Sequence, residues 1–295
     1  FGDILHALVA RGRQVAELRT GRKMNKLLTL LDSTPIRLAG RGHGWADASR
    51  SRHGNQGLKL HVLVASRRSG DGLFDYLSVT DMNVTDMTDA AQMPLQEGRI
   101  YVFDKGYCDY GWWWKIINHG SHFVTRLKRN AAWRLLEERP CEAPDIMSDR
   151  IIELTNRTPR GGKSNPLAGR RLRLVEVSHP SRKGEVLQIV SDLTKAPAEE
   201  IAAHYRERWD IELLFKWIKQ NLKIKRFVGQ SRNAVMIQVY CALIAYILIR
   251  SLAKMITVKR TRDILTLCRM NLFHALKPKK SHHPPQSDRQ QELIL

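Results

Sequence analysis

The stretch from residue 205 to residue 220, YRERWDIELLFKWIKQ, limits what this chain can fold into more than any other segment. On a helical wheel five of its polar side chains share one narrow stripe, namely Tyr205, Arg208, Glu212, Lys216 and Lys219. Apolar side chains cover about two thirds of the helix circumference. A helix of this kind is buried on most of its sides, and its polar stripe faces either water or a cleft.

The polar stripe by itself permits a purely structural interpretation. Arg208 with Glu212, and Glu212 with Lys216, are spaced by four residues, so each pair can stabilise an exposed helix. Such pairs contribute about 0.3–0.5 kcal/mol each on a solvated face. Charged stripes are usually solvated, so the helix taken alone favours an exposed face over a functional site.

The rest of the chain alternates between strand-like and helical patterns. Before residue 131 we expect strands at about 27–33, 34–39, 58–66, 73–80, 99–104 and 121–128. Pro35 separates the first two, because proline restricts a strand to an edge or to a new start. Helices are expected at 1–25, after a cap near Thr85 or Asp86, at 108–120, at about 197–222 and at 232–255.

Residues 131–190 have a different character, because strand-like pieces (RIIELT, RRLRLVEVS, EVLQIVSD) alternate with turn-rich polar stretches. The order of elements predicts a mixed α/β domain that a β-rich insertion interrupts. The expected divisions are a helical remnant of an N-terminal region (1–25), the first part of the domain (26–130), the insertion (131–195), the second part (196–255), and a C-terminal helix with a mobile basic tail (256–295). Because the chain opens on Phe1, we expect a further segment before it.

Two aspartates each end an apolar, strand-like run. Asp32 closes KLLTLLD and Asp104 closes RIYVFD. A carboxylate at the tip of a core strand is unfavourable unless it is solvated, paired or bound to a metal. Each could also serve as a turn or cap residue, since Asp32 precedes Ser-Thr-Pro and Asp104 precedes Lys-Gly. Together with Glu212 they would form an all-oxygen cluster, which suits two Mg²⁺ or Mn²⁺ ions in phosphoryl transfer.

The charge of the chain indicates its partner. Its 49 Lys and Arg exceed its 29 Asp and Glu, which gives a net charge of +20 and points to a polyanion such as nucleic acid. The four cysteines form no CxxC pair, so we expect neither a zinc site nor disulfides, and we expect a protein of a reducing, cytoplasmic compartment. The apolar run 235–249 is too short for a membrane span and predicts a core helix.

These residues resemble bacterial insertion-sequence transposases of the DDE type, in the group with a Tyr-x2-Arg-x3-Glu-x6-Lys signature. That signature stands here as Tyr205, Arg208, Glu212 and Lys219. FDKGY around Asp104 and LLDSTPI around Asp32 are similar to the two aspartate blocks of the group. KLHVLV at 59–64 and NVTD at 83–86 resemble further blocks, so the likeness extends from about residue 26 to about residue 255.

The resemblance implies a ribonuclease-H-like (retroviral-integrase-like) mixed sheet flanked by helices, with the β-rich insertion between the second aspartate and the glutamate. It implies that two divalent ions, Mg²⁺ or Mn²⁺, are held by Asp32, Asp104 and Glu212. It also implies that Tyr205, Arg208 and Lys219 contact phosphates of the transposon end. The group acts on double-stranded DNA, at terminal inverted repeats and at target DNA, and we expect a homodimer on that DNA and no membrane.

Some further residues are open to more than one interpretation. Lys59 shares a strand face with His61, and this face either lines the cleft or is solvated. The loop 41–59 is basic, and we expect Arg41 and Lys59 to touch the DNA backbone. The consecutive tryptophans 112–114 are expected to pack within their helix.

Three hypotheses follow for the function. The first is a transposase that cleaves transposon ends and transfers the strand into target DNA, in cut-and-paste transposition. The second is a ribonuclease-H-like nuclease without strand transfer. The third is a non-catalytic or truncated transposase that binds DNA as an inhibitor.

Overall fold

The computed structural model of the chain describes residues 1–20, 27–38, 42–46, 56–66, 74–141, 143–157, 164–179, 182, 184–221 and 227–255. Two compact units follow one another, Phe1–Ile247 and Leu248–Leu295. The second unit is described only over residues 248–255, which continue the last helix. The fold and the site discussed below belong to the first unit.

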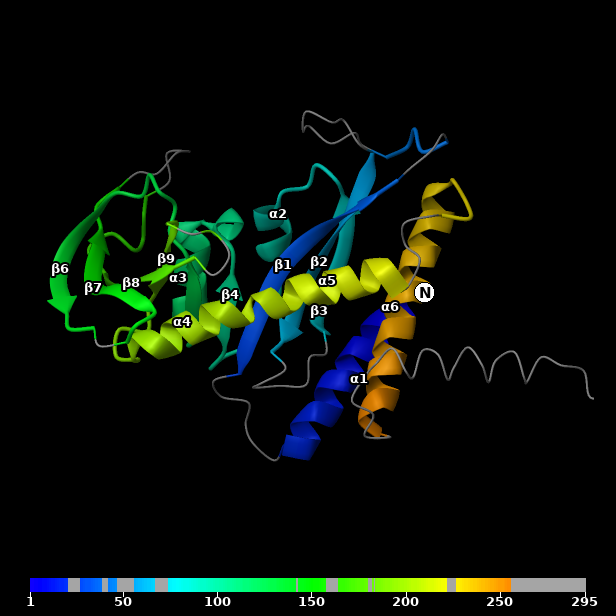
Figure 1. The fold of residues 1–295 in the computed structure, drawn as a ribbon. Helices are drawn as coiled ribbons and strands as arrows, with labels where there is room; N and C mark the ends of the chain where they lie inside the picture. Colours follow the sequence, from blue (N-terminus) through cyan, green and yellow to red (C-terminus); the bar gives the residue numbers. More distant parts are fainter. Residues whose placement is uncertain are drawn as a thin grey trace, which may run out of the picture. The chain divides into compact units, whose positions relative to one another are not determined.

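One mixed sheet of nine strands, in the order β3-β2-β1-β4-β5-β9-β8-β7-β6, organises the first unit (Figure 1). The strands are β1 (Leu28–Arg37), β2 (Gly57–Ala65), β3 (Phe74–Asp81), β4 (Ile100–Phe103), β5 (His122–Arg126), β6 (Trp133–Arg139), β7 (Ile146–Leu154), β8 (Arg171–Ser178) and β9 (Val186–Ser191). The chain therefore has the mixed α/β architecture that its pattern of strands and helices predicts.

Parallel and antiparallel pairing divide the sheet. β1, β4 and β5 are parallel neighbours, so their carboxyl ends meet at one edge. β2 and β3 form an antiparallel hairpin beside β1, as predicted. On the other side, β9 pairs antiparallel with β5, and β8, β7 and β6 follow in antiparallel order. Ligand sites of open α/β sheets lie at the carboxyl ends of parallel strands, which directs attention to the ends of β1 and β4.

The prediction of two short strands around Pro35 was wrong, because β1 runs through this proline as one strand. Pro35 pairs with Lys59 of β2 on one side only. The pairing of β1 with β4 covers Leu28 to Leu30, so among the described strands β1 has no second partner beside Pro35. The missing N–H of proline is therefore tolerated as it is on an edge strand.

Helices cover both faces of the sheet (Figure 1). They are α1 (Gly2–Thr20), α2 (Asp86–Ala90), α3 (Tyr110–Asn118), α4 (Ala198–Glu207), α5 (Trp209–Asn221) and α6 (Arg232–Met255), with a 3-10 turn, η1 (Lys105–Tyr107), after β4. Alternate residues of each strand enter two cores: Leu30 packs with the core of α1, α4, α5 and α6, whereas Leu31 packs with that of α3. This alternation is the period of two of a strand.

Several local predictions are confirmed. Thr85 caps α2 by accepting a hydrogen bond from the Thr88 N–H. Gly120 follows α3 with a φ of 73°, the left-handed conformation that ends helices. Trp112 and Trp113 are buried in the core, as expected of helix packing.

The α6 helix forms as predicted over residues 232–255. Its segment Arg232–Leu252 is long and apolar enough to cross a membrane by length and composition. Core helices meet the same criterion, and Val235, Val239 and Leu243 are buried in the first unit. These contacts are those of the predicted core helix.

The signature helix differs from its prediction in two ways. It is divided at Arg208 into α4 and α5 instead of running unbroken from about 197 to 222. The wheel also placed Trp209 and Leu213 among buried side chains, but they are 56% and 46% exposed. Helical periodicity reports which side chains share a face, and it does not report whether a neighbouring element covers that face.

The strands after residue 131 include the three predicted pieces, as β7, β8 and β9, and an additional one, β6. They do not form a separate sheet, because β9 pairs with β5 over Val124 to Arg126. The catalytic candidates and this β-rich segment therefore share one continuous sheet.

Candidate active site

The two aspartates lie next to each other where the parallel pairing of β1 with β4 ends. Leu30 is opposite Val102 in this pair, and each aspartate follows two residues later. Asp104 directly follows β4 and caps η1. The sequence predicted correctly that the two acids are neighbours, but Asp32 lies in the middle of β1 and not at its end, because this strand continues through Pro35 to Arg37.

Arg208 joins the third acid to this pair. Its Nη1 lies 3.4 Å from Oδ2 of Asp32, and its Nη2 lies 2.6 Å from Oε1 of Glu212. Arg208 occupies the junction between α4 and α5, and its side chain is 15% exposed. One largely buried guanidinium thus links the acid of β1 with the acid of α5, and these charge-assisted hydrogen bonds hold the two carboxylates in place.

The electrostatics of Asp32 show that acidic groups are concentrated here. The pKa of Asp32 is raised to about 6, first by burial and to a smaller extent by the charges of Asp104 and Glu212. Arg208 and the Ser33 N–H, which donates to Asp32 Oδ1 at 2.8 Å, act in the opposite direction. Despite these two contacts, burial disfavours the ionised form of the carboxylate.

The remaining signature residues also face this site. The Tyr205 hydroxyl donates to Asp104 Oδ1 at 3.4 Å, and burial raises the pKa of Tyr205 to about 12. Lys219 Nζ donates to Thr34 Oγ1 of β1 at 2.6 Å. Lys216, the member of the stripe outside the signature, is exposed. The stripe therefore lies against β1 and β4 at Tyr205, Arg208, Glu212 and Lys219, and not at Lys216.

The acids fit a divalent cation in their chemistry. Carboxylate oxygens are the preferred ligands of Mg²⁺ and Mn²⁺, and a cation would stabilise the ionised form of Asp32, which burial first, and then the charges of Asp104 and Glu212, disfavour. Among the residues that the structure describes, no three His, Cys, Asp or Glu side chains converge closely enough to enclose an ion. Arg208 occupies the space between Asp32 and Glu212 instead.

Lys59 and Arg41 were the two other residues that we expected to touch the DNA backbone. Lys59 Nζ bonds Asp86 Oδ1 at 3.1 Å and the Val84 carbonyl at 2.8 Å, and its side chain is 17% exposed. Its neighbour on the strand, His61, is fully buried, so this strand face is not solvated. Arg41 lies outside the described residues.

Sequence reasoning missed three residues around the site. Ser33 and Asp86 are hydrogen-bonded to each other beside Asp32, and Arg126 at the end of β5 acts electrostatically on Tyr205. Arg126 had a usable signal, since it closes the strand that runs parallel to β4. Asp86 had only the resemblance of its NVTD block as a signal, because a residue in the first turn of a helix is otherwise explained by capping.

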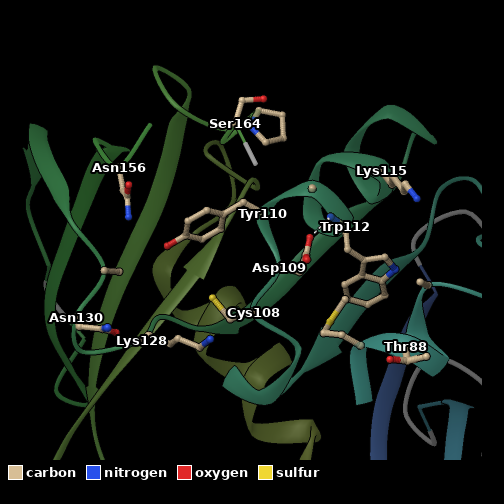
Figure 2. Close-up of a pocket in the computed structure, with 15 residues that line it drawn as sticks. Thr88, Cys108, Asp109, Tyr110, Trp112, Lys115, Lys128, Asn130, Asn156 and Ser164 are labelled. Carbon is tan, nitrogen blue, oxygen red and sulfur yellow. Dashed lines mark hydrogen bonds between the residues drawn. The ribbon is translucent and has the colours of Figure 1, made fainter. Parts of the chain in front are cut away.

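A cavity of about 930 Å³ opens elsewhere, at the start of α3 (Figure 2). Cys108, Tyr110, Trp112, Lys115 and Lys128 line it together with polar side chains of the β-rich segment. None of the three acids lines this cavity, so the cavity and the acidic site are distinct features.

A mixed sheet with two acids side by side at neighbouring parallel strands, and a covering helix that adds a third acid and basic residues, is typical of enzymes of phosphoryl transfer on nucleic acid. Comparison with known protein families identifies the family to which the chain belongs. The chain belongs to the transposase DDE domain family, whose model matches residues 23–248. Enzymes of this family cleave and join DNA and generally use divalent metal ions.

Individual relatives agree with this assignment. The chain is 35% identical over 259 residues to the putative transposase y4zB of Sinorhizobium fredii, covering 85% of this chain and 68% of that protein. It is 28% identical over 258 residues to the probable transposase for insertion sequence element IS5377 of Geobacillus stearothermophilus, covering 84% and 63%. The chain thus spans about two thirds of the length of these relatives.

A solved structure has a similar fold. The chain resembles the piggyBac transposase of a cryo-EM synaptic complex with hairpin DNA, with a TM-score of 0.51 over 88% of this chain and 54% of that one. Their sequences are 10% identical, so the likeness concerns the fold alone.

Proposed function

We propose that the chain catalyses cleavage at the ends of an insertion sequence and transfer of the cut strand into target DNA, with Asp32, Asp104 and Glu212 as the catalytic acids. The observation that carries the proposal is the link that Arg208 makes between Asp32 and Glu212 next to Asp104. This contact brings Asp32 together with Glu212, which is far from it in the sequence, and the three acids resemble the acidic positions of the family.

The three acids would hold two divalent ions, Mg²⁺ or Mn²⁺. Bound there, the ions supply activation of a water or a 3′-hydroxyl and stabilisation of the leaving oxygen. The residues of the chain provide the negative charge, and burial keeps this charge poorly solvated. The raised pKa of Asp32 supports this role, because perturbed carboxylates concentrate at catalytic sites.

The basic residues of the stripe would contact DNA phosphates. Arg208 neutralises Asp32 and Glu212 in the structure, and it exchanges these partners for a phosphate when cations take over the neutralisation. Lys219 and Tyr205 border the same site from α5 and α4, where a phosphate would lie beside the acids. The net charge of +20 supports binding of double-stranded DNA, both at terminal inverted repeats and at the target.

The architecture of the proposal is ribonuclease-H-like. The order β3-β2-β1-β4-β5 and the helices α4 and α5 would form the catalytic domain, and residues 131–195 would be an insertion between Asp104 and Glu212. Paired transposon ends would require two copies of the chain on the DNA. The piggyBac complex is synaptic, which supports such pairing here. The enzyme would act in the bacterial cytoplasm.

A cleavage assay tests the proposal. Purified protein is incubated with a supercoiled plasmid that carries the ends of the element, in Mg²⁺ or Mn²⁺. Cleavage at the ends should disappear in Glu212→Gln, while DNA affinity in EDTA stays within about twofold of wild type. Glu200→Gln is the matched control, because Glu200 lies on α4 with its side chain 50% exposed, and this variant should cleave normally.

The outcomes separate the hypotheses. Cleavage that survives in Glu212→Gln would refute the catalytic role of this acid. Binding of the ends without cleavage by wild type would favour a DNA-binding inhibitor. Nicking without preference for the ends, and without strand transfer, would favour a nuclease of the same fold.

A further inference from the structure

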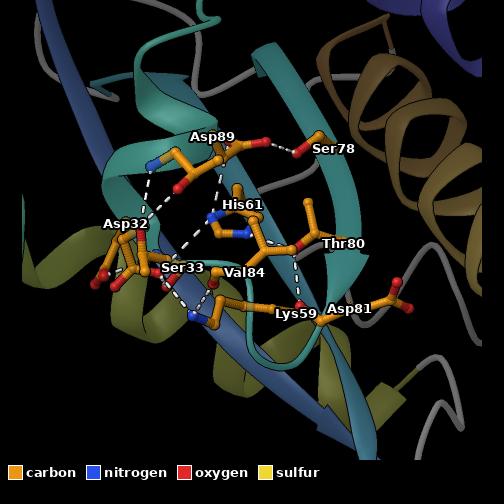
Figure 3. Close-up of polar contacts among 12 residues, drawn as sticks. Asp32, Ser33, Lys59, His61, Ser78, Thr80, Asp81, Val84 and Asp89 are labelled. Carbon is orange, nitrogen blue, oxygen red and sulfur yellow. Dashed lines mark hydrogen bonds and ion pairs between the residues drawn. The ribbon is translucent and has the colours of Figure 1, made fainter. Parts of the chain in front are cut away.

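A cluster of polar side chains adjoins the active site next to Asp32, and the proposed reaction does not use it. It brings together blocks from separate parts of the sequence, since Lys59 and His61 come from β2 and Val84 from the approach to α2 (Figure 3). Asp86 is the first residue of α2. Tyr107 of the FDKGY block borders it, because burial first, and then the charges of Asp86 and Asp32, raise the pKa of this tyrosine. Because these sequence blocks converge next to Asp32, we expect them to serve one function together.

Asp86 is the centre of this cluster. Its Oδ1 accepts a hydrogen bond from Ser33 Oγ at 2.8 Å and another from Lys59 Nζ at 3.1 Å. Lys59 also donates to the Val84 carbonyl at 2.8 Å. A single carboxylate oxygen therefore ties β1, β2 and the start of α2 together at one point.

That point is one residue away from a catalytic acid. Ser33 uses its hydroxyl for Asp86 and its backbone N–H for Asp32 Oδ1, at 2.8 Å. Asp86 therefore reaches Asp32 through the two hydrogen-bonding groups of one residue. If the bond from Ser33 to Asp86 is lost, the Ser33 hydroxyl is free to rotate, and the part of β1 that presents the Ser33 N–H to Asp32 loses its tie to α2. Misplacement of a catalytic group by about 1 Å has large effects on rate.

Charge gives the ion pair a second role. Asp89 is nearly fully buried beside Asp86, and His61 Nδ1 lies 3.8 Å from a carboxylate oxygen of each. Without the Lys59 ammonium, Asp86 would add its charge to a region that already contains three catalytic acids. Lys59 neutralises Asp86, so the acid can hold Ser33 without increasing the repulsion at Asp32.

We propose that Asp86 and Lys59 are positioning residues, whose ion pair holds Ser33 and thereby orients the Asp32 carboxylate toward the ions and the reacting DNA. The inference rests on the proposed function. It assigns the Lys59 ammonium a structural partner within the chain instead of a DNA phosphate. Residues that orient ligating groups in this way typically change ion affinity by about 10–100-fold when they are replaced.

The test measures two quantities. The first is the Kd for Mn²⁺ without DNA, from electron paramagnetic resonance of free Mn²⁺, and the second is the Mn²⁺ concentration that gives half-maximal cleavage. We expect Asp86→Asn and Lys59→Met to raise both the Kd and this concentration about tenfold. Ser33→Ala removes only the hydroxyl, and we expect it to raise both values in the same direction by about threefold. Because this change is small, it keeps the inference testable if a charge variant fails to fold. DNA affinity in EDTA should stay at the wild-type value in Lys59→Met.

Asp75→Asn is the control for general destabilisation. Asp75 pairs with Arg99 at 3.2 Å, and both side chains are more deeply buried than those of the Lys59–Asp86 pair. This pair lies at the start of β3 and before β4, at the opposite end of β4 from Asp104. Asp75→Asn should therefore lower the unfolding temperature and leave Mn²⁺ affinity unchanged.

Two results would overturn the inference. If Asp86→Asn, Lys59→Met and Ser33→Ala bind Mn²⁺ as wild type does, the cluster is a packing feature only. If Asp75→Asn weakens Mn²⁺ binding as much as they do, the effect is one of general stability. Failure of wild-type protein to bind Mn²⁺ or to cleave is a separate result, because it refutes the proposed function itself.

Discussion

Replacing Asp32 by Asn should stabilise the fold while it abolishes activity. The ionised carboxylate is buried beside two other acids, and its pKa is about 6 instead of the ordinary 3.8. Asparagine keeps the shape of the side chain and can still accept the hydrogen bond from the Ser33 N–H. The substitution therefore removes an unfavourable charge with little change in packing.

The size of the effect follows from linkage. A raised pKa means that the folded state binds the proton more tightly than the unfolded state, so the wild-type free energy of unfolding falls as pH rises from about 4 to about 6. Each unit is equivalent to 1.36 kcal/mol, so the shift of about two units costs about 3 kcal/mol at pH 7. Asp32→Asn should be more stable by about that amount at pH 7, and by little at pH 4. For a domain of this size we expect a rise in Tm of about 5–10 °C.

Urea unfolding followed by tryptophan fluorescence, in EDTA, measures this difference at pH 7 and at pH 4. The difference between variant and wild type cancels the general effect of acid on a chain of net charge +20. Asp145→Asn is the control, since the Asp145 side chain is 77% exposed and its loss should change stability little at either pH. Saturating Mg²⁺ should stabilise wild type more than the variant, because only wild type retains all three acids. It should therefore remove much of the variant's advantage in free energy of unfolding.

An Asp32→Asn protein that is no more stable than wild type at pH 7 would refute this reasoning. A stability gain that is equal at pH 7 and pH 4 would refute it as well, because the gain must follow the ionisation of Asp32.

Three further predictions concern other parts of the structure. Lys219→Met should weaken DNA binding and reduce by about one the slope of log affinity against log salt, measured by fluorescence anisotropy. Arg173→Met should lower the free energy of unfolding by about 3–5 kcal/mol in urea titrations, because it leaves Asp149 buried without its partner, and a neutral result would show that water reaches this pair. Gly120→Ala should cost about 1–2 kcal/mol by the same method, because Gly120 has a φ of 73° and an added Cβ would lie 2.9 Å from the Glu97 side chain.

The sequence was sufficient to predict the three acids and most of the elements. Asp32 and Asp104 could be found because each ends an apolar run, and the parallel pairing of their strands then makes them neighbours. Glu212 could be found because its stripe is polar on a mostly apolar helix. In each case the signal was a local conflict between a charge and its apolar surroundings.

The features that the sequence did not predict depend on contacts between distant segments. Trp209 and Leu213 are exposed because no described element covers that side of α5, which a helical wheel cannot reveal. Pro35 fits within β1 because β4 pairs only with the beginning of that strand. Asp86 meets Ser33 across 53 residues of sequence, and each residue alone has an ordinary local explanation.

The pairing of β9 with β5 has a consequence for how such chains change over evolutionary time. The chain leaves the parallel part of the sheet after Arg126 and returns at Ile189, which is the partner of Arg126 in the antiparallel ladder. The points of departure and return are thus adjacent, whatever length of chain lies between them. Lengthening, shortening or exchanging the intervening strands leaves the start of α4 in place, so the β-rich segment can diversify without disturbing the acids that α5 and its neighbours present.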